Sequence, residues 1–303
     1  MCFNKNNRLL SLITINQRLL HFLTWLVIST NTCISYADDT ILVNRPSSET
    51  DSRYQYPNTL LKHILEETEV QYGKAKIQPA KLVMARNRTL IELEKGINIH
   101  VMAEAPKPGW EERLIPVRIP IRKGIQGFRT FLILAKNQAR LSKITSLEQL
   151  KEIRTGSGQQ WSTTRVLKEN GFNVQEGRNY EGLFRMLMND RFITFGRGIN
   201  ETTAEYLSHK QKYPELAIEQ DLLLYIPLPT YFFVTPTRPK LAQRIEIGLL
   251  TMINNGKFEK IFKQEFSEVI KESRLSQRRI FKINNPNLSK LTPLQIKDYW
   301  YQP

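Results

Sequence analysis

Residues 154–168, RTGSGQQWSTTRVLK, indicate the fold class of the chain. An apolar approach leads into a predicted turn that holds Gly156 and Gly158, and a helical pattern follows over residues 161–170. Backbone N–H groups at such a helix start are unpaired and carry the positive end of the helix dipole, so they suit an anionic group of a ligand. A strand-to-helix turn without a ligand is the alternative interpretation.

The first 37 residues have the pattern of a secretory signal. They contain three basic and no acidic residues, an apolar run over residues 19–28, and the small-x-small triplet Ser35-Tyr36-Ala37. The run is shorter and more polar than the ~20 apolar residues that span a bilayer. We therefore expect cleavage near Ala37 and a periplasmic protein. An uncleaved N-terminal anchor is the alternative.

The positions of the cysteines and the net charge exclude several kinds of site and partner for the exported chain. Both cysteines, Cys2 and Cys33, lie in the predicted signal, so the remaining chain has no disulfide, no Cys-based metal site and no Cys nucleophile. It keeps 41 basic and 29 acidic residues, a net charge of +12. No nucleic-acid motif accompanies this charge. We expect a solvated basic face and no nucleic-acid partner.

Strand and helix patterns alternate along the chain, which predicts an α/β protein. Apolar strands at residues 128–136 and 231–234 bracket a middle block, and helices follow the second. This order predicts two lobes, each a mixed sheet flanked by helices, with the two strands crossing between them as a hinge. The predicted boundaries are 1–37 for the signal, 38–134 for lobe 1, 135–228 for lobe 2, 229–275 for the return to lobe 1, and 276–303 for a C-terminal extension packed on the body.

Motifs of catalytic and metal sites are missing from the sequence. It has no GxSxG, HExxH or CxxC, and the histidines after the signal, His63, His100 and His209, are widely spaced. We therefore expect neither an enzyme nor a metal site nor a cofactor. Ligands of two-lobed proteins bind in the cleft between the lobes, where closure buries them.

Several passages resemble the extracellular solute-binding proteins of family 3, which have the type 2 periplasmic-binding-protein fold. The resemblance covers roughly residues 40–268 and rests on FLILAKNQARLSKITSLEQLKEI, TGSGQQW, YEGLFRMLMNDRF and LAQRIEIGLLTMINNGKFEKIFKQEF. An uncharacterised branch is indicated by GWEERLIPVRIPIRKGIQGFR, GRGINE, LYIPLPTYFFVTP and the tail NPNLSKLTPLQIKDYWYQP. The family implies an Arg in the first lobe that grips a ligand carboxylate, and Arg113 is the candidate. Gln159, Gln160 and Trp161 replace the family's small hydroxyl residues, and its acidic residue near the return strand has no match.

The predicted ligand-binding residues are Trp110, Arg113, Gly158, Gln160, Trp161, Arg197 and Asn200. Arg113 offers a bidentate grip on an anion, or instead pairs with Glu111 or Glu112. Trp161 and Trp110 offer rings for stacking, or instead belong to the core. Arg197 ends a strand where α/β clefts form, or instead makes a surface salt bridge.

These features predict an exported, monomeric binder of a small polar or anionic solute that works with an ABC-type transporter. The alternative is a periplasmic sensory or envelope-associated module with the same fold, whose partner is a sensor protein. An enzyme of the dehydratase type is a third class, which requires an acid or base near Arg113 and Arg197. The tail, residues 284–303, is either an arm packed over the body or a partner-binding segment.

Overall fold

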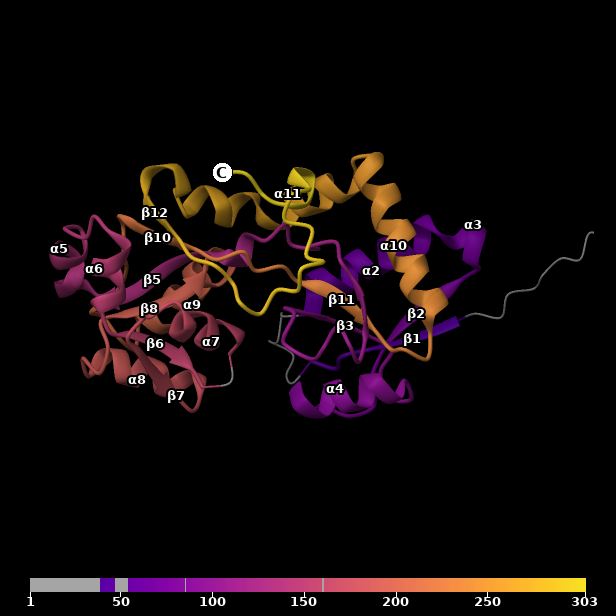
Figure 1. Cartoon of the computed structure of the whole chain (residues 1–303), viewed down its shortest axis with the longest axis horizontal. Coiled ribbons are helices and arrows are strands. Elements are labelled where there is room, and N and C mark those ends of the chain that lie inside the picture. The colour runs from indigo at the N-terminus through magenta and orange to yellow at the C-terminus, as the bar shows by residue number, and fades with distance from the viewer. Residues whose placement is uncertain (1–38, 47–53, 85, 160) are drawn as a thin grey trace, which may run out of the picture. The chain divides into compact units, whose positions relative to one another are not determined.

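The strands of the protein form two mixed sheets (Figure 1). The computed structural model describes residues 39–46, 54–84, 86–159 and 161–303. One sheet, in the order β2-β1-β3-β11-β4, contains β1 (Asp39–Val43), β2 (Ala75–Pro79), β3 (Val101–Glu104), β4 (Ile115–Val117) and β11 (Tyr231–Val234). The other, in the order β12-β10-β5-β8-β6-β7 with β9 paired to β5, contains β5 (Phe128–Leu134), β6 (Thr155–Gly158), β7 (Val174–Gly177), β8 (Thr194–Gly198), β9 (Leu216–Ile218), β10 (Leu222–Tyr225) and β12 (Arg279–Lys282).

Helices flank both sheets, which confirms the predicted α/β class. The first sheet is accompanied by α2 (Gln55–Glu67), α3 (Glu69–Tyr72), α4 (Arg86–Lys95) and α10 (Pro239–Asn254). The second is accompanied by α5 (Gln138–Leu141), α6 (Leu147–Glu152), α7 (Ser162–Glu169), α8 (Tyr180–Met188) and α9 (Ile199–Lys210). α11 (Lys257–Glu272) contacts α9 and α10.

Alternation along β11 distributes its side chains between two cores. Phe232 and Val234 join the core that α2, α10 and α11 cover. Tyr231 and Phe233 join a second core with Leu93 of α4. Both faces of this strand are buried, which explains its continuous apolar sequence.

Local signals in the middle of the chain are confirmed where they depend on nearby residues. The predicted capping box forms at the start of α6: the Ser146 side chain accepts the N–H of Gln149, and the Gln149 side chain accepts the N–H of Ser146. The helical pattern over residues 161–170 folds as α7.

The predicted glycine turn is wrong, because Thr155–Gly158 is the strand β6, with β7 and β8 parallel on its two sides. The glycines admit aromatic rings. A Cβ at Gly156 would collide with the ring of Phe192, and a Cβ at Gly158 would lie 2.5 Å from Cε2 of Trp161. The two glycines therefore mark places where an aromatic ring packs closely against a strand, and not a turn where the chain reverses direction.

The two strands predicted to cross between lobes each belong to one sheet. β5 pairs with β8, β9 and β10, whereas β11 pairs with β3 and β4. The chain therefore passes between the sheets through residues 118–127 and 226–230, and a third time through α10 and α11 before β12. Ile226 donates its N–H to the carbonyl of Gly127 at 2.9 Å, so these two segments touch directly. The predicted lobe boundaries stay predictions, because Asp38–Pro303 packs as a single unit.

Two predictions fall on residues that the structure does not describe, namely the signal at residues 1–37 and Gln160. Within the described ranges, no helix is long and apolar enough to cross a membrane.

Candidate functional site

A pocket of about 400 Å³ opens in front of Trp161, which precedes the first residue of α7. One wall is the loop with Lys107 and Pro108, which follows β3 of the first sheet. The opposite wall is α7 with the end of β7 beside it. The lining residues are Lys107, Pro108, Gln159, Trp161, Ser162, Thr164, Arg165, Lys168, Glu169, Glu176 and Asn287.

The start of α7 gives this pocket a positive end. The N-cap residue Trp161 makes no side-chain cap, and the first turn of α7 holds no acidic residue. By contrast, Asn179 caps α8 by accepting the N–H of Gly182 at 2.7 Å. An uncapped first turn retains N–H donors and the positive pole of the helix dipole.

Ion pairs balance most charges farther along α7. Arg165 binds Glu169 at 2.5 Å, and Lys168 pairs with Glu176 of β7. Lys107 adds a cationic group to the opposite wall, with Nζ 5.4 Å from the ring centre of Trp110. A solute whose anionic group faces the start of α7 therefore matches this pocket electrostatically.

The Trp161 ring is held in place from behind. It stacks on Phe195 with 6.0 Å between ring centres and 19° between planes, and the guanidinium carbon of Arg197 lies 4.5 Å from the Trp161 centroid. Gly158 leaves room for this position. The structure therefore brings together the predicted residues Gly158, Trp161 and Arg197.

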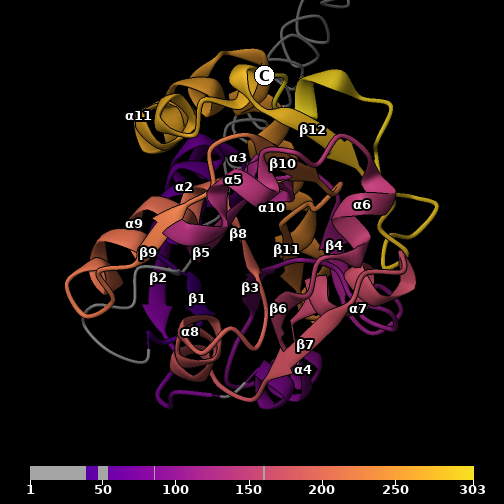
Figure 2. The ribbon, with the colours of Figure 1, turned by 90° about the vertical axis from the view of Figure 1, so that its left-hand side faces the viewer.

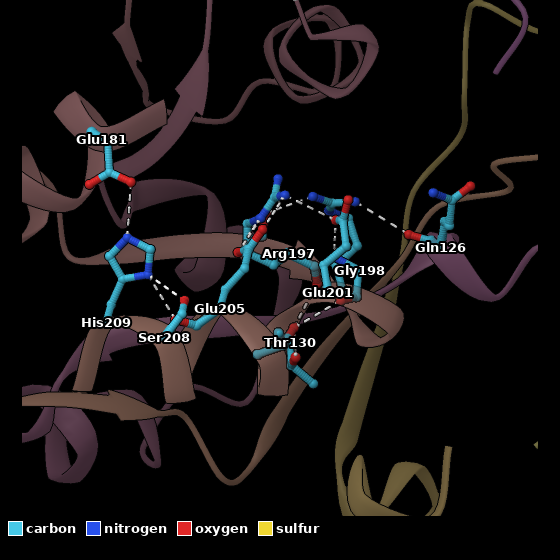
Figure 3. Close-up of polar contacts among 12 residues, drawn as sticks. Gln126, Thr130, Glu181, Arg197, Gly198, Glu201, Glu205, Ser208 and His209 are labelled. Carbon is cyan, nitrogen blue, oxygen red and sulfur yellow. Dashed lines mark hydrogen bonds and ion pairs between the residues drawn. The ribbon is translucent and has the colours of Figure 1, made fainter. Parts of the chain in front are cut away.

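Arg197 is fixed in turn by two carboxylates of α9 (Figure 3). Its Nε and Nη2 bind the two carboxylate oxygens of Glu205 at 2.7 and 2.6 Å, and Nη2 lies 3.2 Å from Glu201. Burial alone would lower the pKa of Arg197, but Glu201 and Glu205 outweigh it and raise that pKa. Arg197 is thus a support for Trp161 rather than a free anion-binding group.

A second buried arginine, Arg129, adjoins this pair. It donates to the carbonyls of Gly196 at 2.6 Å and Gln126 at 3.3 Å, and burial lowers its pKa to about 10. Burial would raise the pKa of Glu201, but the nearby Arg197 and Arg129 lower it. Arg129 and Arg197 are buried, whereas the side chains of Glu205 and Glu201 are 13 % and 34 % exposed, so these carboxylates pair the two buried arginines at the edge of the packed interior.

Asn200, predicted as a ligand contact, lies in the first turn of α9 and is not its N-cap. The strand β8 extends to Gly198, which becomes the N-cap, and Glu201 accepts the N–H of Gly198 at 3.2 Å. Within the described part of the chain, the buried Oδ1 of Asn200 has no hydrogen-bond partner. It is an acceptor close to the Arg197 cluster.

Of the predicted residues that the structure describes, only Trp161 is part of the pocket lining. Gly158, Arg197 and Asn200 lie outside the lining, and so do Arg113 and Trp110. Arg113 is exposed and binds Glu94 of α4 through both Nε (3.2 Å) and Nη2 (2.5 Å), so its partner is neither Glu111 nor Glu112. Trp110 is 5 % exposed and packs edge-on against Phe233 at 5.5 Å. It belongs to the core beneath the loop that holds Lys107.

Sequence patterns indicate the rest of the lining only in part. Lys107 and Pro108 lie in residues 105–127, which contain four prolines, and long irregular segments of compact chains are often functional. Asn287, in the tail, had no local signal. No group of three or more His, Cys, Asp or Glu residues within the described ranges could hold a metal ion.

No family model and no curated protein matches the sequence of this chain. Solved structures do match it. The probable amino-acid ABC transporter extracellular-binding protein ytmK from Bacillus subtilis aligns with a TM-score of 0.55 and 15 % identity, over 76 % of this chain and 98 % of that chain. An ancestral arginine-binding protein bound to arginine aligns with a TM-score of 0.51 and 18 % identity, over 76 % and 100 %.

The chain has the fold of the amino-acid-binding proteins of ABC transporters. A structure from work on glutathione import through GshT and the cystine ABC importer of Streptococcus mutans shares this solute-binding-protein fold, with a TM-score of 0.51, 14 % identity and coverage of 76 % and 96 %. So does AncCDT-1, an ancestral amino-acid-binding protein and precursor of cyclohexadienyl dehydratase, with a TM-score of 0.51, 14 % identity and coverage of 75 % and 95 %. These matches confirm the predicted two-lobed architecture.

Proposed function

We propose that the protein captures a small polar or anionic solute in the pocket between the Lys107 loop and α7. The observation that carries this proposal is that a pocket of about 400 Å³ is lined both by a loop that follows β3 and by α7 with the end of β7. Its volume falls in the range of about 300–1,000 Å³ that small-molecule sites occupy. Separation of these two walls would open the pocket, and their approach would bury a solute.

The lining favours a solute with one anionic group and one flat or apolar part. The first turn of α7 offers N–H donors to the anion. The half-buried Trp161 ring offers a stacking surface that Arg197 and Phe195 keep rigid. Amino acids, small organic acids and short peptides are the first classes to test.

Thermal shift against a panel of these solutes tests the proposal. A solute at 100 times its dissociation constant should add about 2.7 kcal/mol to the free energy of unfolding. The variant Gly158→Ala should abolish this shift, because the new Cβ must displace the Trp161 ring. Gly196→Ala in the adjacent strand is the matched control, since its Cβ would meet Phe131 at an ordinary 3.5 Å. Equal binding by wild type and Gly158→Ala would contradict this site.

We propose further that the solute is passed to an ABC-type transporter after export of the protein through its N-terminal signal. The shared fold supports this role. A pull-down of detergent-solubilised permease by the solute-loaded protein tests it, and capture of a sensor protein instead would favour the signalling alternative.

We also propose a binding rather than a catalytic role. The acidic groups next to Arg197 are engaged as ion-pair partners, and the acidic group next to Arg113 is Glu94, likewise paired. Recovery of every bound solute unchanged after prolonged incubation is the expected result. Conversion of a dehydratable substrate would contradict it.

A further inference from the structure

The C-terminal tail, residues 283–303, connects the two sides of the proposed pocket. It leaves β12, which pairs in parallel with β10 at the edge of the second sheet. Figure 1 shows the tail in yellow running from β12 toward α11, and Figure 2 shows it passing α7. It therefore follows a defined path over the body of the protein.

Two side chains of the tail bind opposite walls of the pocket. Nδ2 of Asn287 donates to the carbonyl of Ser162 at the start of α7, at 3.2 Å. The hydroxyl of Ser289 donates to Oε2 of Glu111 at 2.9 Å, in the loop that also holds Lys107. Two residues of extended chain span at most about 7 Å. The tail therefore limits how far these walls can separate while both bonds remain.

Contacts at both ends prevent the tail from sliding. Before the two bonds, Asn285 donates from Nδ2 to the carbonyl of Pro227 at 2.8 Å. After them, the N–H of Tyr301 donates to the carbonyl of Lys123 at 2.8 Å. The Trp300 ring lies on Gly124, where an added Cβ would be 2.5 Å from Cε3. Lys123 and Pro227 belong to residues 118–127 and 226–230, two of the segments that connect the sheets, so the tail is anchored beside these connections.

We propose that the tail is a strap that sets the width of the pocket and must release one wall before a solute can enter or leave. Asn287, which is 93 % buried and itself lines the pocket, positions the strap on α7. Ser289 is the releasable end, because its partner Glu111 keeps Arg118 as a second partner at 2.8 Å when the serine departs. This proposal deepens the proposed function and rests on the pocket being the solute site.

Ser289→Ala removes the bond to Glu111 with little change in volume. We would measure the separation of the walls in the full chain by pulsed electron paramagnetic resonance between spin labels at Ile91→Cys on α4 and Arg185→Cys on α8. Both sites are exposed. Cys2→Ser and Cys33→Ser remove the sequence's two native cysteines. Ser267→Ala, at an exposed serine of α11, is the matched control.

Without solute, the distance distribution of Ser289→Ala should broaden and shift to longer distances than in wild type and Ser267→Ala. With a solute identified by thermal shift, the dissociation rate should rise about tenfold, as expected for loss of a hydrogen bond to a charged group. An unchanged distribution in both Ser289→Ala and the double variant Asn287→Ala/Ser289→Ala would overturn the strap. Because the distance measurement needs no solute, failure of the strap and failure of the solute panel are distinguishable.

Discussion

His100 shows how a single residue responds to groups that folding brings beside it. Its Nδ1 accepts the N–H of Leu42 at 3.1 Å and a guanidinium N–H of Arg238 at 2.9 Å. Both partners are donors, so the imidazole is neutral and its proton is on Nε2. Burial lowers the pKa of His100 below 6.5, and the charge of Arg238 lowers it further.

The stability of the protein should therefore fall as the pH drops below about 6.5. The unfolded chain takes up this proton near the ordinary histidine pKa, whereas the folded chain resists it, so acid favours unfolding. His100→Asn retains an acceptor near Nδ1 and cannot titrate. The melting temperature of His100→Asn should fall less between pH 7.5 and 5.5 than the melting temperature of the wild type. His63→Asn, on α2, is the control, and an equal loss in wild type and His100→Asn would contradict the assignment.

Arg113 illustrates why residue types alone did not place the site. It was the candidate for the carboxylate-binding Arg that the family resemblance implies, but its guanidinium pairs with Glu94 of α4 in the folded chain. Trp161 and Arg197 were predicted separately as contacts for a ligand. In the structure the guanidinium carbon of Arg197 lies 4.5 Å from the centre of the Trp161 ring, so Arg197 supports Trp161.

At the scale of elements, the two connecting segments are joined through Gly127. The carbonyl of Ile226 lies where a Cβ of residue 127 would be, and the N–H of Ile226 binds the carbonyl of Gly127. The side chains add to this contact, since Thr230 donates from Oγ1 to Gln126 at 2.5 Å. The two connecting segments thus form a paired unit rather than two independent strands.

Gly127→Ala should lower the free energy of unfolding by about 1–3 kcal/mol, the usual range for an atom forced into packed structure. Chemical denaturation would measure the loss. Gly196→Ala, which meets only ordinary contacts, should lose much less. Equal stabilities of the two variants would show that the segments can separate without cost.

For the whole molecule, the tail ties remote parts of the chain together. Trp300 is 6 % exposed, packs on Gly124, and donates from Nε1 to the carbonyl of Pro293 at 2.9 Å. The ring centre of Tyr301 lies 6.0 Å from that of Phe128 and 6.3 Å from that of Phe262. The last residues therefore extend the core that α11 covers.

Trp300→Ala should cost about 3 kcal/mol, at the lower end of values for buried tryptophans. Loss of this anchor should also expose the tail to trypsin at Lys290 and Lys297. Melting and limited proteolysis with mass spectrometry would measure both effects. Trp300→Phe retains a ring on Gly124 and should behave closer to wild type. Equal resistance of the tail to trypsin in wild type, Trp300→Ala and Trp300→Phe would contradict the anchoring role of Trp300.

The sequence by itself determined the α/β class, the order of elements and helix starts such as Ser146, because apolar periodicity and capping act within a few residues. The tertiary structure decided the role of Gly158, the partners of Arg197 and the contribution of the tail to the pocket. Asn287 and Ser162 are 125 positions apart, and Ser289 and Glu111 are 178 apart. Such bonds leave no local pattern in the sequence, because only the packing of both sheets brings their partners within reach.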